Sequence, residues 1–356
     1  MLVLNGCFSD KSDESIQEID LSKMMTKEEA YFHLDEQSTF SNLYVKYFDD
    51  GITDYFSFLN EINNNIYVYK YSDPEIYKKI SIAKELGRII GYDFIDDSLV
   101  SIITHKNIIC KFNIHNNNTS IVSFSKDAKK PYSSHIRTSH SFFHVSEKYY
   151  WPNVILGHNM NNLINTFELS HSDIVQKMNY PNYIKNSNKI LFENFYEFYY
   201  VYDSLMEKFI FSFPFSDSLI ITDLELNNSS TIQAGSSLID IKPVFNRNWS
   251  NKEKVMRLRF HTPYYYAIIP DNYRNVYYRM LVNPVYSSSA DLSKLDFHDK
   301  PINVLVFDNQ FIKLSEKRLE ENKYAAYIYF VSRKGLNICN REKSIDDEST
   351  IYFDVF

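Results

Sequence analysis

Basic side chains that could grip an anion gather in one stretch of this 356-residue sequence. Arg257, Arg259 and His261 alternate, so a strand at this point would project all three side chains from one face. Arg274 and Arg279 follow a short distance along the chain. Guanidinium groups bind carboxylate, sulfate or phosphate through paired hydrogen bonds. We therefore predict a ligand-binding cluster at this point. Its predicted contacts are Arg259, His261, Arg274, Tyr278 and Arg279.

A structural role is the alternative for these arginines. Arginine pairs with a carboxylate to hold segments together more often than it marks a ligand site. Asp271, Asp291 and Asp296 lie close enough in sequence to be such partners. The two interpretations differ in where the guanidinium groups point, which is into an open pocket or into the protein.

Other signals for chemistry are weaker. His135, His140 and His144 lie near one another, but no carboxylate joins them at metal-ligand spacing. We predict no metal and no cofactor. The sequence lacks the G-x-S-x-G, H-E-x-x-H, Walker A and dinucleotide-binding motifs. No catalytic residue is predicted, although convergent charged side chains on one scaffold would support a glycan hydrolase or lyase.

Aromatic residues make up 16% of the chain, with 29 Tyr and 27 Phe. Runs such as Tyr196 to Tyr202 and Tyr264 to Tyr266 could stack on sugar rings. Alternate residues of a strand must face inward, so packing between sheets is the competing role for these rings. The aromatic bias also favours strands over helices.

Period-2 patterns dominate the chain and group into about six clusters of short strands, spaced in the range of propeller blades. One example is the meander of Leu99–Thr104, Ile108–Ile114 and Ile121–Phe124. We predict an all-β, β-propeller-like fold of about six antiparallel blades over residues 21–356. A large β-sandwich is the alternative. The last strands should pair with an N-terminal strand to close the ring. Short helices are predicted within 21–34 and 75–86.

Turns and charge narrow the class of protein further. Only 7 Gly are present, and Asn runs such as Asn63–Asn65 and Asn116–Asn118 stand between predicted strands, where Asn tolerates the left-handed backbone region. A net charge of −7 without a dense basic run argues against a nucleic-acid partner. No apolar stretch is long enough for a transmembrane helix.

The N-terminal residues Leu4-Asn5-Gly6-Cys7 resemble a bacterial lipobox, in which Cys7 would be lipidated. The acidic segment after Cys7 resembles the surface-export signals of Bacteroidetes lipoproteins, and residues 1–20 would then be a signal remnant and tether. Only six residues precede Cys7, fewer than a secretory signal needs, so this interpretation requires a start upstream of Met1. The alternative is an ordinary cysteine in a frayed terminus.

Two further segments carry a family resemblance. They are Asp271-Asn272-Tyr273-Arg274-Asn275-Val276-Tyr277-Tyr278-Arg279 and Gly335-Leu336-Asn337-Ile338, the latter followed by an aromatic C-terminal end. They resemble a domain-of-unknown-function family of Bacteroidetes lipoproteins, which implies a six-bladed propeller-like fold in the cell envelope. We therefore expect an outer-membrane lipoprotein, periplasmic or surface-exposed, that binds an unknown ligand or envelope protein. A glycan-active enzyme and a scaffolding protein are the alternatives.

Overall fold

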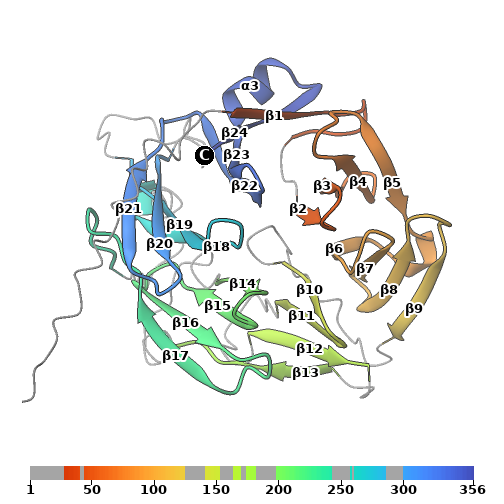
Figure 1. The fold of residues 1–356 in the computed structure, drawn as a ribbon, viewed down its shortest axis with the longest axis horizontal. Coiled ribbons are helices and arrows are strands. Elements are labelled where there is room, and N and C mark those ends of the chain that lie inside the picture. Colours follow the sequence, from red (N-terminus) through yellow and green to blue (C-terminus); the bar gives the residue numbers. More distant parts are fainter. Residues whose placement is uncertain are drawn as a thin grey trace, which may run out of the picture.

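The computed structural model describes residues 28–40, 44–124, 141–152, 163–169, 174–181, 198–242, 257–258, 260–285 and 300–356. These residues form six antiparallel sheets of four strands each. Figure 1 shows the sheets arranged around a central axis as the blades of a propeller. The predicted six-bladed propeller is confirmed, and the sandwich alternative is wrong.

The first three blades are meanders of four strands in chain order. Blade 1 consists of β2 (Tyr44–Asp49), β3 (Asp54–Asn60), β4 (Asn65–Lys70) and β5 (Ile76–Ser81). Blade 2 consists of β6 (Ile89–Phe94), β7 (Leu99–Thr104), β8 (Ile108–Asn113) and β9 (Thr119–Phe124). Blade 3 consists of β10 (Phe143–Val145), β11 (Lys148–Pro152), β12 (Ile164–Glu168) and β13 (Ile174–Lys177).

Blades 4 and 5 repeat this order, and blade 6 borrows its outer strand from the N-terminal region. Blade 4 consists of β14 (Tyr199–Asp203), β15 (Lys208–Ser212), β16 (Ser218–Thr222) and β17 (Ser229–Gln233). Blade 5 consists of β18 (Tyr264–Asp271), β19 (Val276–Val282), β20 (Ile302–Asp308) and β21 (Lys313–Arg318). Blade 6 consists of β22 (Tyr324–Ser332), β23 (Gly335–Asn340), β24 (Thr350–Val355) and β1 (Glu28–His33), with helix α3 (Arg341–Asp346) before β24.

The ring closes through the pairing of β1 with β24. The two strands are antiparallel, from Glu28 opposite Val355 to His33 opposite Thr350, and they lie side by side in Figure 1. The pairing covers an edge of β24 that would otherwise expose unpaired backbone groups. The predicted closure by an N-terminal strand is confirmed.

Asparagine supplies many of the tight turns, as predicted. Among the described residues, Asn64, Asn107, Asn117, Asn275 and Asn322 adopt positive φ angles between 57° and 62°. Such angles are costly for most side chains but tolerable for Asn, whose amide can bond to the local backbone. The chain can therefore make its hairpins with few glycines.

Aromatic rings fill the spaces between blades. Phe32 of β1 in blade 6 stacks on Phe56 of β3 in blade 1 with ring centroids 4.3 Å apart, and on the sheet of blade 1 itself Phe58 stacks on Tyr67 at 4.9 Å. Tyr202 is half-buried, whereas Tyr199, Tyr200 and Tyr264 to Tyr266 of the Tyr-rich runs are buried. For these buried tyrosines the packing interpretation is confirmed.

Three local predictions are wrong. Residues 28–33 form strand β1 rather than a helix, and most of 75–86 forms strand β5, with only a 3-10 turn at Lys84–Leu86 (η1). Both strands lie at the outer edge of a blade, where one face meets solvent and charged residues are common, so their sequences lack the apolar alternation of inner strands. Arg257, residues 258 and 260, and His261 are helical rather than part of a strand.

Candidate binding pocket

The turn between β18 and β19 contains one predicted ligand contact, Arg274, and two more, Tyr278 and Arg279, lie in β19. Asp271 ends β18, and its Oδ1 accepts the backbone N–H groups of Tyr273 at 3.1 Å and Arg274 at 3.0 Å. This arrangement, an Asx turn, replaces backbone hydrogen bonds that a four-residue connection cannot make for itself. Asn275 completes the turn with φ 57°. The turn is therefore shaped by Asp271 and Asn275.

Arg274 and Tyr278 converge on the same carboxylate. Arg274 Nη1 lies 3.0 Å from Asp271 Oδ2, and the Tyr278 hydroxyl donates to that oxygen at 3.0 Å. The guanidinium also donates to the carbonyl oxygens of Ser332 at 3.3 Å, at the end of β22, and of Arg333 at 2.8 Å, in the β22–β23 turn of blade 6. These bonds join blade 5 to blade 6.

Tyr273 extends this connection to blade 1. Its hydroxyl donates to Asp49 Oδ2 at 2.8 Å, at the end of β2. Arg333 binds both oxygens of Asp49, with Nε 2.5 Å from Oδ2 and Nη2 2.6 Å from Oδ1. This paired hydrogen bond is the largest cause that lowers the pKa of Asp49 to about 2. Three blades thus meet at one ionised carboxylate.

Arg279 points in the opposite direction, towards blade 4. Its side chain is fully buried and donates to Ser212 Oγ through Nε at 3.2 Å and Nη2 at 3.0 Å. It also donates to the carbonyl oxygens of Ser216, Asp217 and Ala234 at 2.6 to 3.1 Å. The guanidinium lies 3.4 Å from the centre of the Tyr265 ring. Arg279 therefore holds blade 5 against blade 4.

The predicted ligand contacts do not all come together. Arg274 and Tyr278 face blade 6, Arg279 faces blade 4, and the half-buried His261 has its Nδ1 2.5 Å from the carbonyl oxygen of Val285. Arg259 and Cys7 lie outside the described residues. The contacts of Arg274 follow the structural alternative, since it pairs with Asp271. A ligand role for these residues stays a prediction.

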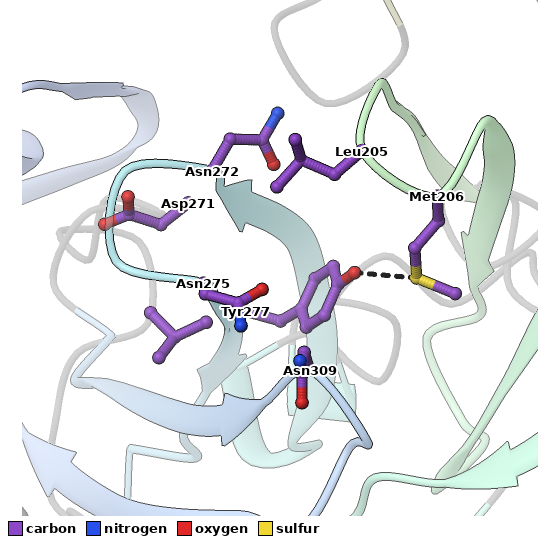
Figure 2. Close-up of a pocket in the computed structure, with 8 residues that line it drawn as sticks. Leu205, Met206, Asp271, Asn272, Asn275, Tyr277 and Asn309 are labelled. Atoms are coloured by element: carbon purple, nitrogen blue, oxygen red, sulfur yellow. Dashed lines mark hydrogen bonds between the residues drawn. The ribbon is translucent and has the colours of Figure 1, made fainter.

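The same β18–β19 turn forms one wall of a pocket between blades 4 and 5, with a volume of about 250 Å³. Figure 2 shows its three sources: the β14–β15 turn, the β18–β19 turn and the β20–β21 turn. The described lining residues are Leu205, Met206, Asp271, Asn272, Asn275, Val276, Tyr277 and Asn309. The motif thus contributes to a pocket, but through side chains other than its arginines.

The facing turn has the same construction as the β18–β19 turn. Asp203 ends β14, and its Oδ1 accepts the backbone N–H groups of Leu205 at 2.8 Å and Met206 at 3.1 Å. The residue four positions later, Glu207, has φ 52°. Two Asx turns of matching geometry therefore stand opposite each other across the pocket.

Hydrogen bonds connect the two turns at the pocket wall. The Tyr277 hydroxyl donates to Asp203 Oδ2 and lies 2.9 Å from Met206 Sδ, the contact drawn in Figure 2. The Tyr277 ring stacks on Phe311 with centroids 4.4 Å apart. Asn272 Nδ2 donates to Ser204 Oγ at 2.9 Å. These contacts hold the two turns in a fixed position relative to each other.

The lining is polar but offers no accessible charge among the described residues. The Asp271 carboxylate is buried and already binds Arg274 and Tyr278. Burial, and then the hydrogen bond to Asp203, raise the pKa of Tyr277 above its usual value, so its hydroxyl stays protonated at neutral pH. The exposed amides of Asn272, Asn275 and Asn309 and the apolar surfaces of the other residues remain for a ligand.

Metal and membrane features are absent from the described part of the chain. No group of three His, Cys, Asp or Glu side chains there could hold a metal ion. His144 lies beside Tyr149, with ring centroids 4.6 Å apart, and burial followed by the charge of Lys111 lowers its pKa. His135 and His140 lie outside the described residues. None of the described helices has the length and apolar character to cross a membrane.

Comparison with known proteins identifies the fold. No family model and no curated protein matches this chain. Its structure is similar to that of a DUF4221 family member from Bacteroides vulgatus, with a TM-score of 0.76 and 20% identity over 93% of this chain and 96% of the other. It is also similar to a candidate exported protein from Bacteroides fragilis, with a TM-score of 0.56 and 10% identity over 92% and 94% of the two chains. The predicted resemblance to a family of unknown function from Bacteroidetes is confirmed at the level of fold.

Proposed function

We propose that this propeller is a binding module of the cell envelope, held there by a lipid on Cys7, and that it binds a small ligand between blades 4 and 5. The observation that carries the binding role is the pocket itself. Its two walls are fixed by Asx turns and by the Tyr277–Asp203 hydrogen bond, so little ordering is needed when a ligand enters.

A binding role fits the lining better than a catalytic one. General acid–base catalysis of glycan cleavage needs two carboxyl groups that face the substrate. Asp271 is the single carboxylate among the described lining residues, and its oxygens already accept hydrogen bonds from its own turn, Arg274 and Tyr278. The pocket therefore supports recognition of a ligand rather than its hydrolysis.

An envelope location is supported by two independent observations. The lipobox-like pattern ending at Cys7 supplies an attachment point, and one protein of similar fold is a candidate for export. The described cysteines, Cys110 and Cys339, are buried and free, so they place no demand on the redox state of the compartment.

Metabolic labelling tests the anchor. The protein, expressed with a lipoprotein signal peptide placed ahead of Cys7 in a Bacteroides host fed with alkynyl palmitate, should carry the label and sediment with membranes. Cys7→Ala should lose both properties, whereas Cys339→Ala, which removes a buried thiol, should retain them. Equal labelling of the wild type and Cys7→Ala would contradict the proposal.

Ligand capture tests the pocket. The purified protein is incubated with a small-molecule extract of the host and examined by native mass spectrometry for a bound mass. Asn309→Trp should abolish that mass because a large ring at this exposed position fills the pocket mouth. Gln310→Trp, one residue further along the same turn, is the matched control. A mass retained in Asn309→Trp would place the ligand elsewhere.

A further inference from the structure

We infer that the ligand of this pocket is a single uncharged, hydroxyl-rich ring, which is the chemistry of a neutral monosaccharide or a sugar residue at a glycan end. This inference rests on the proposed function, because it names the ligand class of the same pocket. It follows from the size of the pocket, its charge, its hydrogen-bonding groups and its apolar surface, taken in turn.

The size of the pocket limits the ligand to about one ring. Sites for drug-sized molecules usually occupy about 300 to 1,000 Å³, and this pocket has a volume of about 250 Å³. Only about one ring of a larger ligand could enter that space. A single six-membered ring with its substituents fits in it.

The charges around the pocket disfavour an anion. Two carboxylates, Asp203 and Asp271, lie buried behind the walls. Arg274, the basic residue of the β18–β19 turn, directs its guanidinium to Asp271 and to the carbonyl oxygens of blade 6. No Lys or Arg occurs among the described lining residues. An anionic ligand would therefore lose its hydration without gaining a cationic partner.

A cation gains little more from these carboxylates. Asp271 Oδ1 accepts two backbone N–H groups, and its Oδ2 accepts from Arg274 and Tyr278. Asp203 Oδ1 likewise accepts two backbone N–H groups, and its Oδ2 accepts from Tyr277. Both carboxylates are committed to the protein, so the groups that face a ligand are neutral.

The neutral groups suit hydroxyls. Asn272, Asn275 and Asn309 are exposed at the pocket and come from two different turns of blade 5. A primary amide both donates and accepts hydrogen bonds, as does a hydroxyl. Asn272 donates through Nδ2 to Ser204 Oγ, and its carbonyl oxygen can accept from a hydroxyl. The amides can therefore bind several hydroxyls at the edge of one ring.

Apolar side chains supply the remaining surface. Leu205 and Met206 line the pocket together with the largely buried Val276 and Tyr277, and Figure 2 shows the Tyr277 ring between Met206 and the two asparagines Asn275 and Asn309. Sugar rings present hydroxyl edges and C–H faces, and surfaces that are part aromatic and part polar suit such amphipathic ligands. The lining has both characters within one small pocket.

Saturation-transfer NMR on the full chain with Cys7→Ser, which stays free of lipid, tests this inference. The probes are glucose, galactose, mannose and N-acetylglucosamine as neutral sugars, glucuronate and glucose 6-phosphate as anions, glucosamine as a cation, and glutamine as an amide. At least one neutral sugar should bind, and its charged counterpart should bind about tenfold more weakly or not at all.

Variants locate the binding. Asn275→Gly removes the amide while tolerating the positive φ, and it should weaken the sugar affinity about tenfold, as should Asn309→Ala. Asn322→Gly is the matched control, because Asn322 has a similar φ of 62° and lies in the β21–β22 connection outside the pocket. Equal weakening in Asn322→Gly would refute the assignment of the pocket.

The outcomes separate this inference from the proposed function. Binding of the anions alone would overturn the sugar assignment and would favour the predicted Arg259–His261 cluster instead. Binding of glutamine or glucosamine alone would also overturn it, while the proposed binding role would stand. A third outcome is a bound mass from the host extract that Asn309→Trp abolishes, together with no response to any sugar. This outcome would also overturn the sugar assignment and leave the proposed binding role standing. No response to any probe and no captured mass would refute both proposals.

Discussion

Replacing Arg279 should destabilise the propeller more than replacing any exposed arginine of the same blade. The guanidinium is fully buried and provides the hydrogen-bond donors for Ser212 Oγ and three backbone carbonyl oxygens of blade 4. Methionine keeps much of the aliphatic volume but supplies no donor. Arg279→Met therefore leaves four buried acceptors facing an apolar side chain.

The magnitude follows from the cost of such orphaned groups. Each unsatisfied buried polar group costs about 1–3 kcal/mol, and removal of one partner from a buried charged network costs about 3–5 kcal/mol in total. We expect Arg279→Met to lower the free energy of unfolding by about 4 kcal/mol. With an unfolding entropy of about 2.1 cal/mol/K per residue, this loss corresponds to a fall in Tm of about 5 °C for a chain of this length.

Urea unfolding followed by tyrosine fluorescence and circular dichroism measures the effect. Arg279→Lys should lie between the wild type and Arg279→Met, because lysine keeps the charge but not the planar set of donors. Arg318→Met is the matched control, since the Arg318 side chain is 53% exposed and pairs with a half-exposed Glu321; its effect should stay within about 0.5 kcal/mol. If Arg279→Met and Arg318→Met differ by less than about 1 kcal/mol, Arg279 does not hold the two blades together.

Three further predictions concern other parts of the ring. Gly335→Ala should lower the free energy of unfolding by about 2–4 kcal/mol, because φ is 154° and the new Cβ would lie 2.1 Å from the carbonyl oxygen of the last residue. Gly51→Ala, with φ 90° and nothing near its Cβ, should lower the free energy of unfolding in urea by about 1 kcal/mol. Equal losses of stability in the two glycine variants would contradict the predicted clash at Gly335. Since the pKa of Asp49 is lowered to about 2 from 3.8, its contribution to stability is present above pH 4 and is lost as the pH falls towards 2. Asp49→Asn should therefore be less stable than the wild type at pH 6, and its urea midpoint should fall less steeply as the pH is lowered. Parallel plots of urea midpoint against pH for the two proteins would refute this role of Asp49. Burial raises the thiol pKa of Cys110 to about 11 and of Cys339 to about 12, so Ellman's reagent should label neither at pH 8 until urea is added.

The sequence predicted the architecture because its strongest signals come from inner and middle strands. The meander of blade 2, the six-fold grouping and the asparagine turns follow from apolar alternation and turn chemistry, and the need for a closing strand follows from the edge that the last strands would otherwise expose. Several outer strands were missed for the same reason, although the outer strand of blade 2 was predicted. In β17 (Ser229–Gln233), four of the five residues are exposed, and its sequence carries no alternation. Only pairing with β16 makes this segment a strand, and pairing is a tertiary property.

The pocket was missed because the prediction followed charge. The arginines of the motif stand out in the sequence, yet Arg274 and Arg279 donate their hydrogen bonds to neighbouring blades. A better signal was present. In four described hairpins an Asp or Asn side chain accepts two backbone N–H groups, and a residue with positive φ follows four positions after it. These pairs are Asn60 and Asn64, Asn113 and Asn117, Asp203 and Glu207, and Asp271 and Asn275. This repeat marks hairpin turns of one type, although it does not reveal which turns meet across blades.

The two uses of the β18–β19 turn have a common physical origin. A buried charged group is tolerated only when its hydrogen bonds are complete, so the charged residues of the motif must point into neighbouring blades, where carbonyl oxygens and carboxylates are available. The neutral amides carry a smaller cost of desolvation and can stay at the surface, where a ligand can displace water from them. The β14–β15 and β18–β19 turns have the same shape and face each other, and the side chains of the two turns leave a pocket between them. Asp271 and the arginines therefore fix the blades in place, and in the proposed binding role the asparagines determine what the pocket binds.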